Sequence, residues 1–304
     1  MMEPVCWLNG EFLRMSQAAL PVWDLGVVAG ASVTEMARTF RHRPFRLERH
    51  VDRLVTSLQE LGFPGKWSSA ALLAAARSVL AHNLRDLAKG SDLGVVLFCT
   101  AGANATYLGG GTGESFAGIH TFELPFDMWK PGFHQGVRLR IPSIRQIPAE
   151  CFPVTYKVRN RLHWWLADQE ANRMESGSRA LLLDQAGNVT ETSTSALHAI
   201  IDGGIVTPSE GVLRSLSSQV VEELAGSLGI PFERRRLSVD ELSRAEEVVL
   251  SSTPVCLLPV SHVGSSPSGP SLEAGFPGPQ GPVFRQLLDA WSLLVDMRID
   301  DQFA

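Results

Sequence analysis

The stretch ALLLDQAGNVTETSTSALHAIIDGGIVTP, residues 180–208, decides how the second half of the chain folds. Its aliphatic and β-branched runs are separated by Gly, Asn and Asp, which is typical of short strands joined by tight turns. We predict a strand, a turn at residues 185–188, a second strand, a turn at residues 202–204 and a third strand. Glu191 falls on the second strand between small hydroxyl residues, where it is either exposed to solvent or directed at a ligand.

Lys157 lies upstream, in TYKVRNRLHWWLADQEA, residues 155–171. It follows the extended run CFPVTY and precedes a predicted helix that reaches about residue 175. A lysine at the start of a helix is usually a solvated charge. It can also point into a pocket and act as a nucleophile. Its position alone leaves both readings open.

Length and composition indicate a folded protein large enough for two domains. The chain has 304 residues, 44% of them apolar, and a net charge of −5 without a basic stripe, so no nucleic-acid partner is expected. No apolar run reaches the length of a membrane span, and the N-terminus lacks a secretory signal pattern. Scattered cysteines favour a reducing cytoplasm, and scattered histidines predict no metal site.

Short strands and two helices are expected in the first part of the chain. VCWLNGEFL predicts two strands around an Asn-Gly turn, and GASVTEMARTFRHRPFRL a hairpin whose turn lies near residues 43–44. LERHVDRLVTSLQELGF has helical spacing, and residues 68–83 form a second helix with a serine cap. DLGVVLFCTAG is a strand that leads into a glycine-rich loop. IHTFELPFDMWKPGF looks irregular and is the expected domain boundary.

Three common enzyme motifs are absent from the sequence. It contains neither the G-x-S-x-G nucleophile elbow nor the G-x-x-x-x-G-K-[ST] phosphate loop. The cluster GGGTGE lacks the G-x-G-x-x-G spacing, and no βαβ unit surrounds it. A serine hydrolase, a P-loop NTPase and a Rossmann dehydrogenase therefore lose support.

A constellation of separate features remains: Lys157, Glu191, the helix start at residues 215–218, residues 251–253 at the end of a buried strand, and Arg53. A helix N-terminus, hydroxyl groups and a guanidinium together suit a phosphate. A carboxylate can face a heterocyclic nitrogen, and a lysine amine can attack an aldehyde. These are the demands of pyridoxal 5′-phosphate, although each residue alone has an ordinary structural explanation.

The order of these residues resembles the class IV aminotransferases, the pyridoxal-phosphate enzymes of fold type IV. That family includes branched-chain and D-amino-acid aminotransferases and aminodeoxychorismate lyase. The similarity extends from about Trp7 to about Trp291. The matching stretches include WLNGEF, DLGVVAGASVTEMART, FRLERHVDRL, YKVRNRL and the region around VTETSTS.

The resemblance implies a role for each residue of the constellation. Lys157 would form a Schiff base with the cofactor, and Glu191 would pair with its pyridine nitrogen. The phosphate would be held by Arg53, the Leu216 N–H, Ser217 and Thr253.

The resemblance also implies a fold and an assembly. The fold would be a two-domain α/β (α+β) structure like that of D-amino-acid aminotransferase. A small N-terminal domain (1–122) and an interdomain loop (123–130) would precede a large cofactor-binding domain (131–304). The active site would lie between the domains of a cytoplasmic homodimer, in which a loop of the partner helps to close it.

The implied reaction moves an amino group between an amino acid and a 2-keto acid, through the Lys157 Schiff base and pyridoxamine phosphate. Freed from the cofactor, Lys157 would act as the general base. Two alternatives stay open. One is aminodeoxychorismate lyase, which releases pyruvate and p-aminobenzoate, and the other is a catalytically degenerate relative.

Several positions depart from the family pattern. The NRL sequence around Arg161 replaces a tyrosine of the branched-chain members and looks more like the lyase. Residues 215–218, SLSS, keep a hydroxyl donor but lack the family's arginine. Pro254 has no N–H, so a contact to the substrate carboxylate is lost. Thr34 replaces a bulky aromatic residue, which predicts a wider or more polar pocket. Loops at residues 109–113 and 127–133 are expected to shape specificity.

Overall fold

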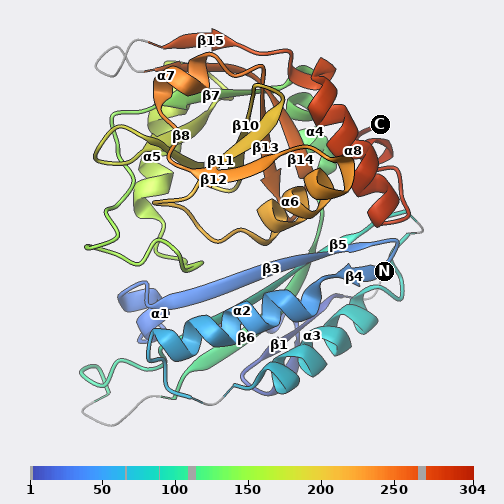
Figure 1. The fold of residues 1–304 in the computed structure, drawn as a ribbon. Coiled ribbons are helices and arrows are strands. Elements are labelled where there is room, and N and C mark those ends of the chain that lie inside the picture. Colours follow the sequence, from blue (N-terminus) through green and yellow to red (C-terminus); the bar gives the residue numbers. More distant parts are fainter. Residues whose placement is uncertain (1–2, 66, 89, 109–113, 266–271) are drawn as a thin grey trace. The chain divides into compact units, whose positions relative to one another are not determined.

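The chain forms two compact units in the computed structural model, which describes residues 3–65, 67–88, 90–108, 114–265 and 272–304 (Figure 1). The first unit comprises Met1–Leu124 and Tyr156–Asn160, and the second comprises Pro125–Thr155 and Arg161–Ala304. Lys157 therefore belongs to the first unit, although it lies within the expected large domain. The domain limits 1–122, 123–130 and 131–304 stay a proposal. The glycine-rich residues 109–113 lie outside the described ranges.

The first unit contains one antiparallel sheet of six strands, in the order β2-β1-β6-β5-β3-β4. Helices α2 and α3 cover one face of it (Figure 1). The short helix α1 precedes β3. The bounds are β1 Val5–Leu8, β2 Glu11–Arg14, α1 Leu25–Val28, β3 Ser32–Phe40, β4 Arg43–Phe45, α2 Leu47–Glu60, α3 Ser69–Asn83, β5 Leu93–Thr100 and β6 Phe116–Glu123.

Alternation along β3 explains which of its side chains enter the core. Val33 and Ala37 are buried in the apolar cluster that α2 and α3 cover. Because side chains alternate across a strand, Glu35 shares their face and points toward α2. The predicted apolar stripe of α2, which includes Leu47 and Val51, packs into the same cluster. The Glu35 carboxylate thus lies among the apolar side chains of β3.

The hairpin turn between β3 and β4 lies two residues earlier than the sequence indicated. Arg41 and His42 occupy it, with φ of 51° and 66°, and β4 begins at Arg43. Left-handed backbone is unfavourable for such residues without support. Asp92 provides it, because its carboxylate accepts the N–H groups of Arg41 at 3.2 Å and His42 at 3.1 Å. The expected turn at residues 43–44 is therefore wrong.

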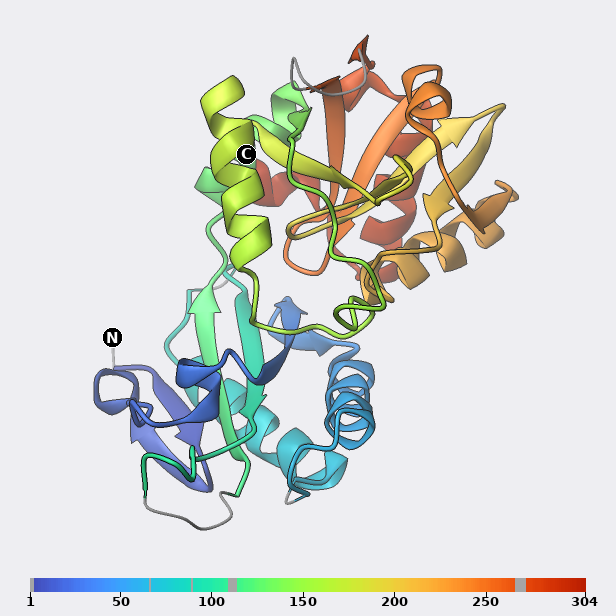
Figure 2. The same cartoon turned by 90° about the vertical axis from the view of Figure 1, so that its left-hand side faces the viewer.

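The second unit contains a mixed sheet in the order β12-β11-β10-β13-β14-β7-β8-β9, with β15 paired to β14. Its strands curl, while α5 packs on β7 and β8 and α6 packs on α8 and β13 (Figure 2). The turns predicted at residues 185–188 and 202–204 are confirmed, but the predicted second strand is two strands, β9 and β10, which residues 193–195 separate. The strands are β7 Val137–Ile141, β8 Arg179–Leu183, β9 Val189–Thr192, β10 Ala196–Ile201, β11 Gly204–Pro208, β12 Phe232–Arg235, β13 Glu247–Ser252, β14 Cys256–Ser265 and β15 Glu273–Gly275. The helices are α4 Phe126–Gln135, α5 Leu162–Met174, α6 Leu216–Leu228, α7 Val239–Ser243 and α8 Pro282–Leu294.

The region expected to be irregular is regular. Strand β6 occupies its first part, and α4 covers the residues 127–133 that were expected to form a specificity loop. Pro131 lies inside α4, where it removes a backbone hydrogen bond. Packing outweighs that cost, because the ring of Phe133 stacks on Phe303 with centroids 4.1 Å apart. No helix in the described part of the chain is long and apolar enough to cross a membrane.

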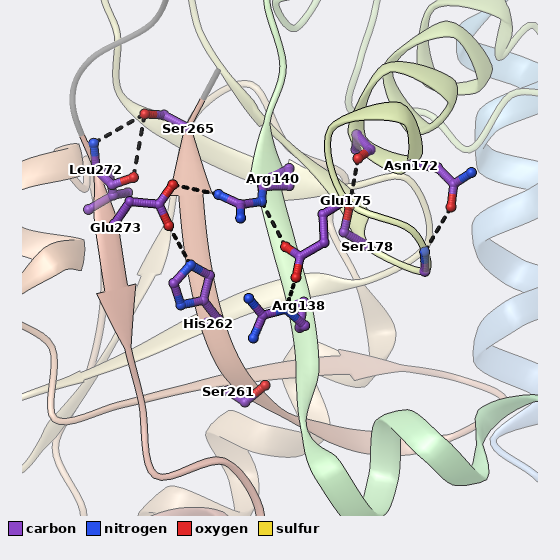
Figure 3. A network of polar contacts seen from close by, with 12 residues as sticks. Arg138, Arg140, Asn172, Glu175, Ser178, Ser261, His262, Ser265, Leu272 and Glu273 are labelled. Carbon is purple, nitrogen blue, oxygen red and sulfur yellow. Dashed lines mark hydrogen bonds and ion pairs between the residues drawn. The ribbon is translucent and has the colours of Figure 1, made fainter. Parts of the chain in front are cut away.

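A polar network fixes the end of α5 against the sheet of the second unit (Figure 3). Glu175, the residue that follows α5, accepts hydrogen bonds from Arg138 and, at 2.8 Å, from Arg140 on β7. Arg140 also donates to Glu273 on β15 at 2.6 Å, and His262 on β14 lies 2.6 Å from the same carboxylate. The network therefore joins one helix to three strands.

A Glu175→Gln variant is expected to unfold at a lower urea concentration, with a loss of about 1–2 kcal/mol, because one carboxylate holds two guanidinium groups. Glu210→Gln is the matched control, since Glu210 makes one exposed ion pair with Arg236 and exposed pairs contribute less than about 1 kcal/mol. Equal losses in the two variants would contradict this account of the network.

Candidate active site

Strand β3 holds the segment that carries Lys157. The carbonyl of Lys157 accepts the N–H of Thr34 at 2.8 Å, and the N–H of Arg159 donates to the carbonyl of Ser32 at 3.1 Å. Val158 and Val33 form an antiparallel bridge between them. Val158 also packs on the apolar core of the first unit. Lys157 is thus attached to the start of a central strand, more than 120 residues away in sequence.

A buried charge cluster lies between β3 and α2. The Glu35 carboxylate, 1% exposed, accepts hydrogen bonds from Arg53 Nε at 2.5 Å and from Arg53 Nη2 at 2.8 Å. His50 Nδ1 lies 2.7 Å from the second carboxylate oxygen. His50 and Arg53 are three residues apart on α2, so both reach the same carboxylate. Glu35 therefore fixes the orientation of the Arg53 guanidinium.

The electrostatics of this cluster define its protonation state. Burial alone would raise the pKa of Glu35, but the charge of Arg53 and the hydrogen bonds from His50 and Arg53 lower it to about 2. Burial lowers the pKa of His50, the hydrogen bond and the charge of Glu35 oppose this effect, and the charges of Arg53 and Lys157 add to it, so that the pKa stays lowered. An ionised Glu35 beside a neutral His50, which donates its Nδ1–H, follows from these directions. The charges of Lys157 and Arg53 thus both affect His50, in the first unit.

Glu191 lies on β9 in the second unit. Its strand neighbours Thr190 and Thr192 are buried, so the Glu191 side chain points to the opposite face. One carboxylate oxygen accepts the N–H of Leu213 at 3.0 Å. Leu213 lies in the segment that leads into α6. The carboxylate is therefore fixed to the backbone just before that helix begins.

The N-terminus of α6 presents hydrogen-bond donors. Ser215 is the N-cap, and its hydroxyl accepts the N–H of Ser218 at 3.2 Å. The N–H groups of Leu216 and Ser217 have no acceptor among the described residues. The Ser217 hydroxyl lies 2.8 Å from that of Ser215 and 3.3 Å from that of Ser251. These groups, with the helix dipole, form an arrangement that suits an anion.

Thr253 belongs to the same region of the second unit. It occupies the turn between β13 and β14, two residues after Ser251, which contacts Ser217. The hydroxyl of Thr253 has no hydrogen-bond partner in the ranges that the structure describes. Pro254 follows it in the turn and has no N–H to offer. Thr253 is thus two residues along the chain from a serine that contacts the first turn of α6.

Arg161 precedes α5, and its guanidinium donates to the carbonyl of Ser193, two residues after Glu191. Loss of hydration lowers the pKa of Arg161, while the charges of Glu191 and Asp168 oppose that effect. The side chain also lies over the ring of Trp164, 5.8 Å from its centroid. Arg161 and Glu191 are therefore electrostatic neighbours within one unit.

The structure groups the expected residues in two sets: Thr34, Arg53 and Lys157 in the first unit, and Arg161, Glu191, Leu216, Ser217, Thr253 and Pro254 in the second. Sequence reasoning missed Glu35, whereas Ser215 and Ser251, which adjoin Ser217, lie in the two segments that it singled out. His50, one of the scattered histidines, makes a buried contact with Glu35. Among the described residues, no group of three or more His, Cys, Asp or Glu could hold a metal ion.

These groups fit a phosphorylated pyridine aldehyde. In the second unit, two N–H groups and two hydroxyls suit its phosphate, and Glu191 suits a protonated ring nitrogen. In the first unit, Lys157 supplies an amine. Glu35 occupies one edge of the Arg53 guanidinium, whose other edge carries further N–H donors.

Solved structures share this architecture. The branched-chain aminotransferase from Escherichia coli matches with a TM-score of 0.82 and 25% identity, covering 96% of this chain and 94% of that one. The branched-chain aminotransferase from the archaeon Thermoproteus uzoniensis, solved with norvaline, matches with a TM-score of 0.81 and 21% identity, covering 96% and 95%. The fold is thus the mixed α/β fold of branched-chain aminotransferases, as the sequence predicted.

Sequence comparison defines the family. The D-alanine aminotransferase of Staphylococcus aureus (strain N315) is 25% identical over 293 residues, covering 95% of this chain and 97% of that protein. The family model for class IV amino-transferases matches residues 32–263. The chain belongs to the class IV aminotransferase family, a family of pyridoxal-phosphate-dependent enzymes, which confirms the resemblance seen in the sequence.

Proposed function

We propose that this protein is a pyridoxal-phosphate-dependent transaminase that moves an amino group between an amino acid and a 2-keto acid. One observation carries the proposal. Glu191 is hydrogen-bonded to Leu213, three residues before the α6 N-terminus. A carboxylate for a ring nitrogen and donors for a phosphate therefore belong to one connected part of the second unit. The two ends of the cofactor require that combination.

We assign the six cofactor contacts to Arg53, Lys157, Glu191, Leu216, Ser217 and Thr253. When bound, pyridoxal phosphate supplies an aldehyde carbon that takes up an amino group and a ring that accepts electrons from the substrate. The Leu216 and Ser217 N–H groups and the two hydroxyls hold the phosphate. Glu191 keeps a proton on the ring nitrogen. Lys157 Nζ removes the proton from the substrate α-carbon and returns one when the keto acid is converted.

The half-reaction without a keto acid tests this function. The purified holoenzyme is mixed with a panel of L- and D-amino acids, and the cofactor absorbance is followed while the released keto acid is measured. At least one amino acid should convert the cofactor to its amine form, with one keto acid released per site. Absence of conversion across the whole panel would contradict transamination.

Aminodeoxychorismate lyase remains the second candidate. The NRL sequence around Arg161 motivates it, and Arg161 lies close to the charge of Glu191. Incubation with aminodeoxychorismate separates the two reactions, because the lyase releases pyruvate and p-aminobenzoate. No release of these products removes the lyase candidate.

A Ser217→Ala variant is expected to bind pyridoxal phosphate about tenfold more weakly or worse, because a hydrogen bond to a charged group contributes about 1.5–3 kcal/mol. Affinity is measured by titrating the apoenzyme and following absorbance. Pyridoxal, which lacks the phosphate, should bind both proteins equally. Ser227→Ala, at the other end of α6, is the control and should change neither affinity. A weaker affinity for pyridoxal as well would place Ser217 away from the phosphate.

A further inference from the structure

Arg159 lies on the sheet face opposite the helices of the first unit. Its guanidinium is 5.1 Å from the ring centroid of Phe98. The strand neighbours of Phe98, Leu97 and Cys99, are both buried in the core that α2 and α3 cover, so Phe98 points to the other face. His120 on β6 shares this face, because it pairs with Val96, two residues from Phe98. Arg159 and His120 therefore lie over the same side of the sheet.

Arg159 has no carboxylate partner in the described part of the chain. Among the described residues, Arg159 contacts the carbonyl of Ser32 through its backbone N–H and the ring of Phe98 through its guanidinium. Loss of hydration lowers its pKa, and no acidic residue opposes this effect. Arg161 differs in this respect, because the charges of Glu191 and Asp168 oppose the lowering of the Arg161 pKa by loss of hydration. Arg159 is exposed, so its guanidinium is accessible to an anion that binds from solution.

His120 places an imidazole on the same face of the sheet as this cation. Its Nδ1 is buried and has no hydrogen-bond partner in the residues that the structure describes. Burial lowers the pKa of His120, a hydrogen bond with the backbone of Thr121 opposes that effect, and the charge of Arg159 lowers the pKa further. Buried polar atoms normally have partners, so this nitrogen indicates a group that the protein alone does not supply. A guanidinium and an imidazole N–H are both donors that suit an oxyanion.

The position of Arg159 in the chain connects this group to the proposed chemistry. Arg159 follows Lys157 by two residues, so the Cα atoms are about 6–7 Å apart. The backbone of both residues is fixed to β3 by the hydrogen bonds with Thr34 and Ser32. An amino acid carries its carboxylate one carbon from its amine, and a dicarboxylic amino acid carries a second one further away. An anion-binding group near the lysine thus suits a substrate carboxylate.

We propose that Arg159, assisted by His120 and supported by the Phe98 ring, binds a carboxylate of the substrate and selects amino acids over amines that lack one. Stacking on Phe98 fixes the guanidinium plane, and the planar fork then binds a carboxylate through two hydrogen bonds. The assignment deepens the proposed function and rests on it.

Half-reaction kinetics of Arg159→Leu and Arg159→Lys with alanine and glutamate test this assignment. For Arg159→Leu the KM should rise about tenfold to hundredfold, with a smaller change in kcat. A rise for both donors assigns the α-carboxylate, and a rise for glutamate alone assigns the side-chain carboxylate. Arg159→Lys should recover part of the loss. Unchanged KM values for both donors would overturn the proposal.

Direct binding separates this proposal from the transaminase assignment. Calorimetry measures the affinity of the holoenzyme for propionate and succinate, which cannot donate an amino group. Binding should weaken about tenfold or more in Arg159→Leu even if no amino acid is converted. Arg85→Leu, at an exposed arginine of the same unit, should match the wild type. Equal affinities of the wild type and Arg159→Leu for these acids would overturn the assignment. If Arg159→Leu does not fold, Arg159→Gln is measured in its place.

Discussion

A Lys157→Ala variant is expected to lose transaminase activity by about 10³-fold or more, because it removes both the amine that binds the cofactor and the general base. Lys157 is attached to β3 through backbone atoms, and alanine keeps those hydrogen bonds. The variant should therefore fold like the wild type, as thermal unfolding can verify. The measurement is the initial rate with the best amino donor found in the panel.

Lys130→Ala is the control for this experiment, since Lys130 lies on α4 and has no place in the proposed site. It should retain wild-type activity. An added primary amine such as methylamine should restore part of the proton transfer in Lys157→Ala, because it can take over the role of the missing side chain. Wild-type rates in Lys157→Ala would contradict the role of Lys157.

A Glu35→Gln variant is expected to lower the free energy of unfolding by about 3 kcal/mol, since breaking a buried charge pair costs about 3–5 kcal/mol and Arg53 keeps some contact with water. The neutral amide can pair with neither Arg53 nor His50 as the carboxylate does. The measurement is urea unfolding at pH 7. Because Glu35 orients Arg53, we also expect weaker binding of pyridoxal phosphate.

Glu48→Gln is the matched control for Glu35→Gln, because Glu48 lies on α2 and pairs with Arg77 at the surface. Its loss should stay below about 1 kcal/mol. The pH dependence gives a further test. The folded-state pKa of Glu35 is lowered to about 2 from 4.5, so its stabilisation is present above about pH 4.5 and is lost as the pH falls toward 2. A wild-type advantage that persists unchanged at pH 2 would contradict the assigned pair.

Local patterns were sufficient to predict the turns at residues 185–188 and 202–204 and the helix around Leu47 and Val51, although the break between β9 and β10 was missed. In both places the hydrophobic period and the turn residues agree with the final packing. The turn at Arg41 and His42 could not be read in this way, because Asp92, about 50 residues away, stabilises its left-handed backbone. The helix around Pro131 was missed for a related reason, since aromatic packing outweighs the proline.

The candidate site was only partly accessible from sequence. Glu35 carried a readable signal, because an acid between Val33 and Ala37 on the core side of a strand requires a buried partner. The attachment of Lys157 to β3 carried none, since it depends on pairing between distant segments. Arg159 was likewise inconspicuous among neighbouring arginines, and only the lack of a carboxylate around it distinguishes it.

The central claim is that Lys157 forms the covalent link to the cofactor, and reduction with borohydride tests it most directly. The chain has only four lysines, Lys66, Lys89, Lys130 and Lys157, so peptide mapping can examine each of them. The holoenzyme is reduced, digested and analysed by mass spectrometry. The account predicts a pyridoxyl group on the Lys157 peptide at about one per chain. A label on another lysine, or none after loading with pyridoxal phosphate, would contradict it.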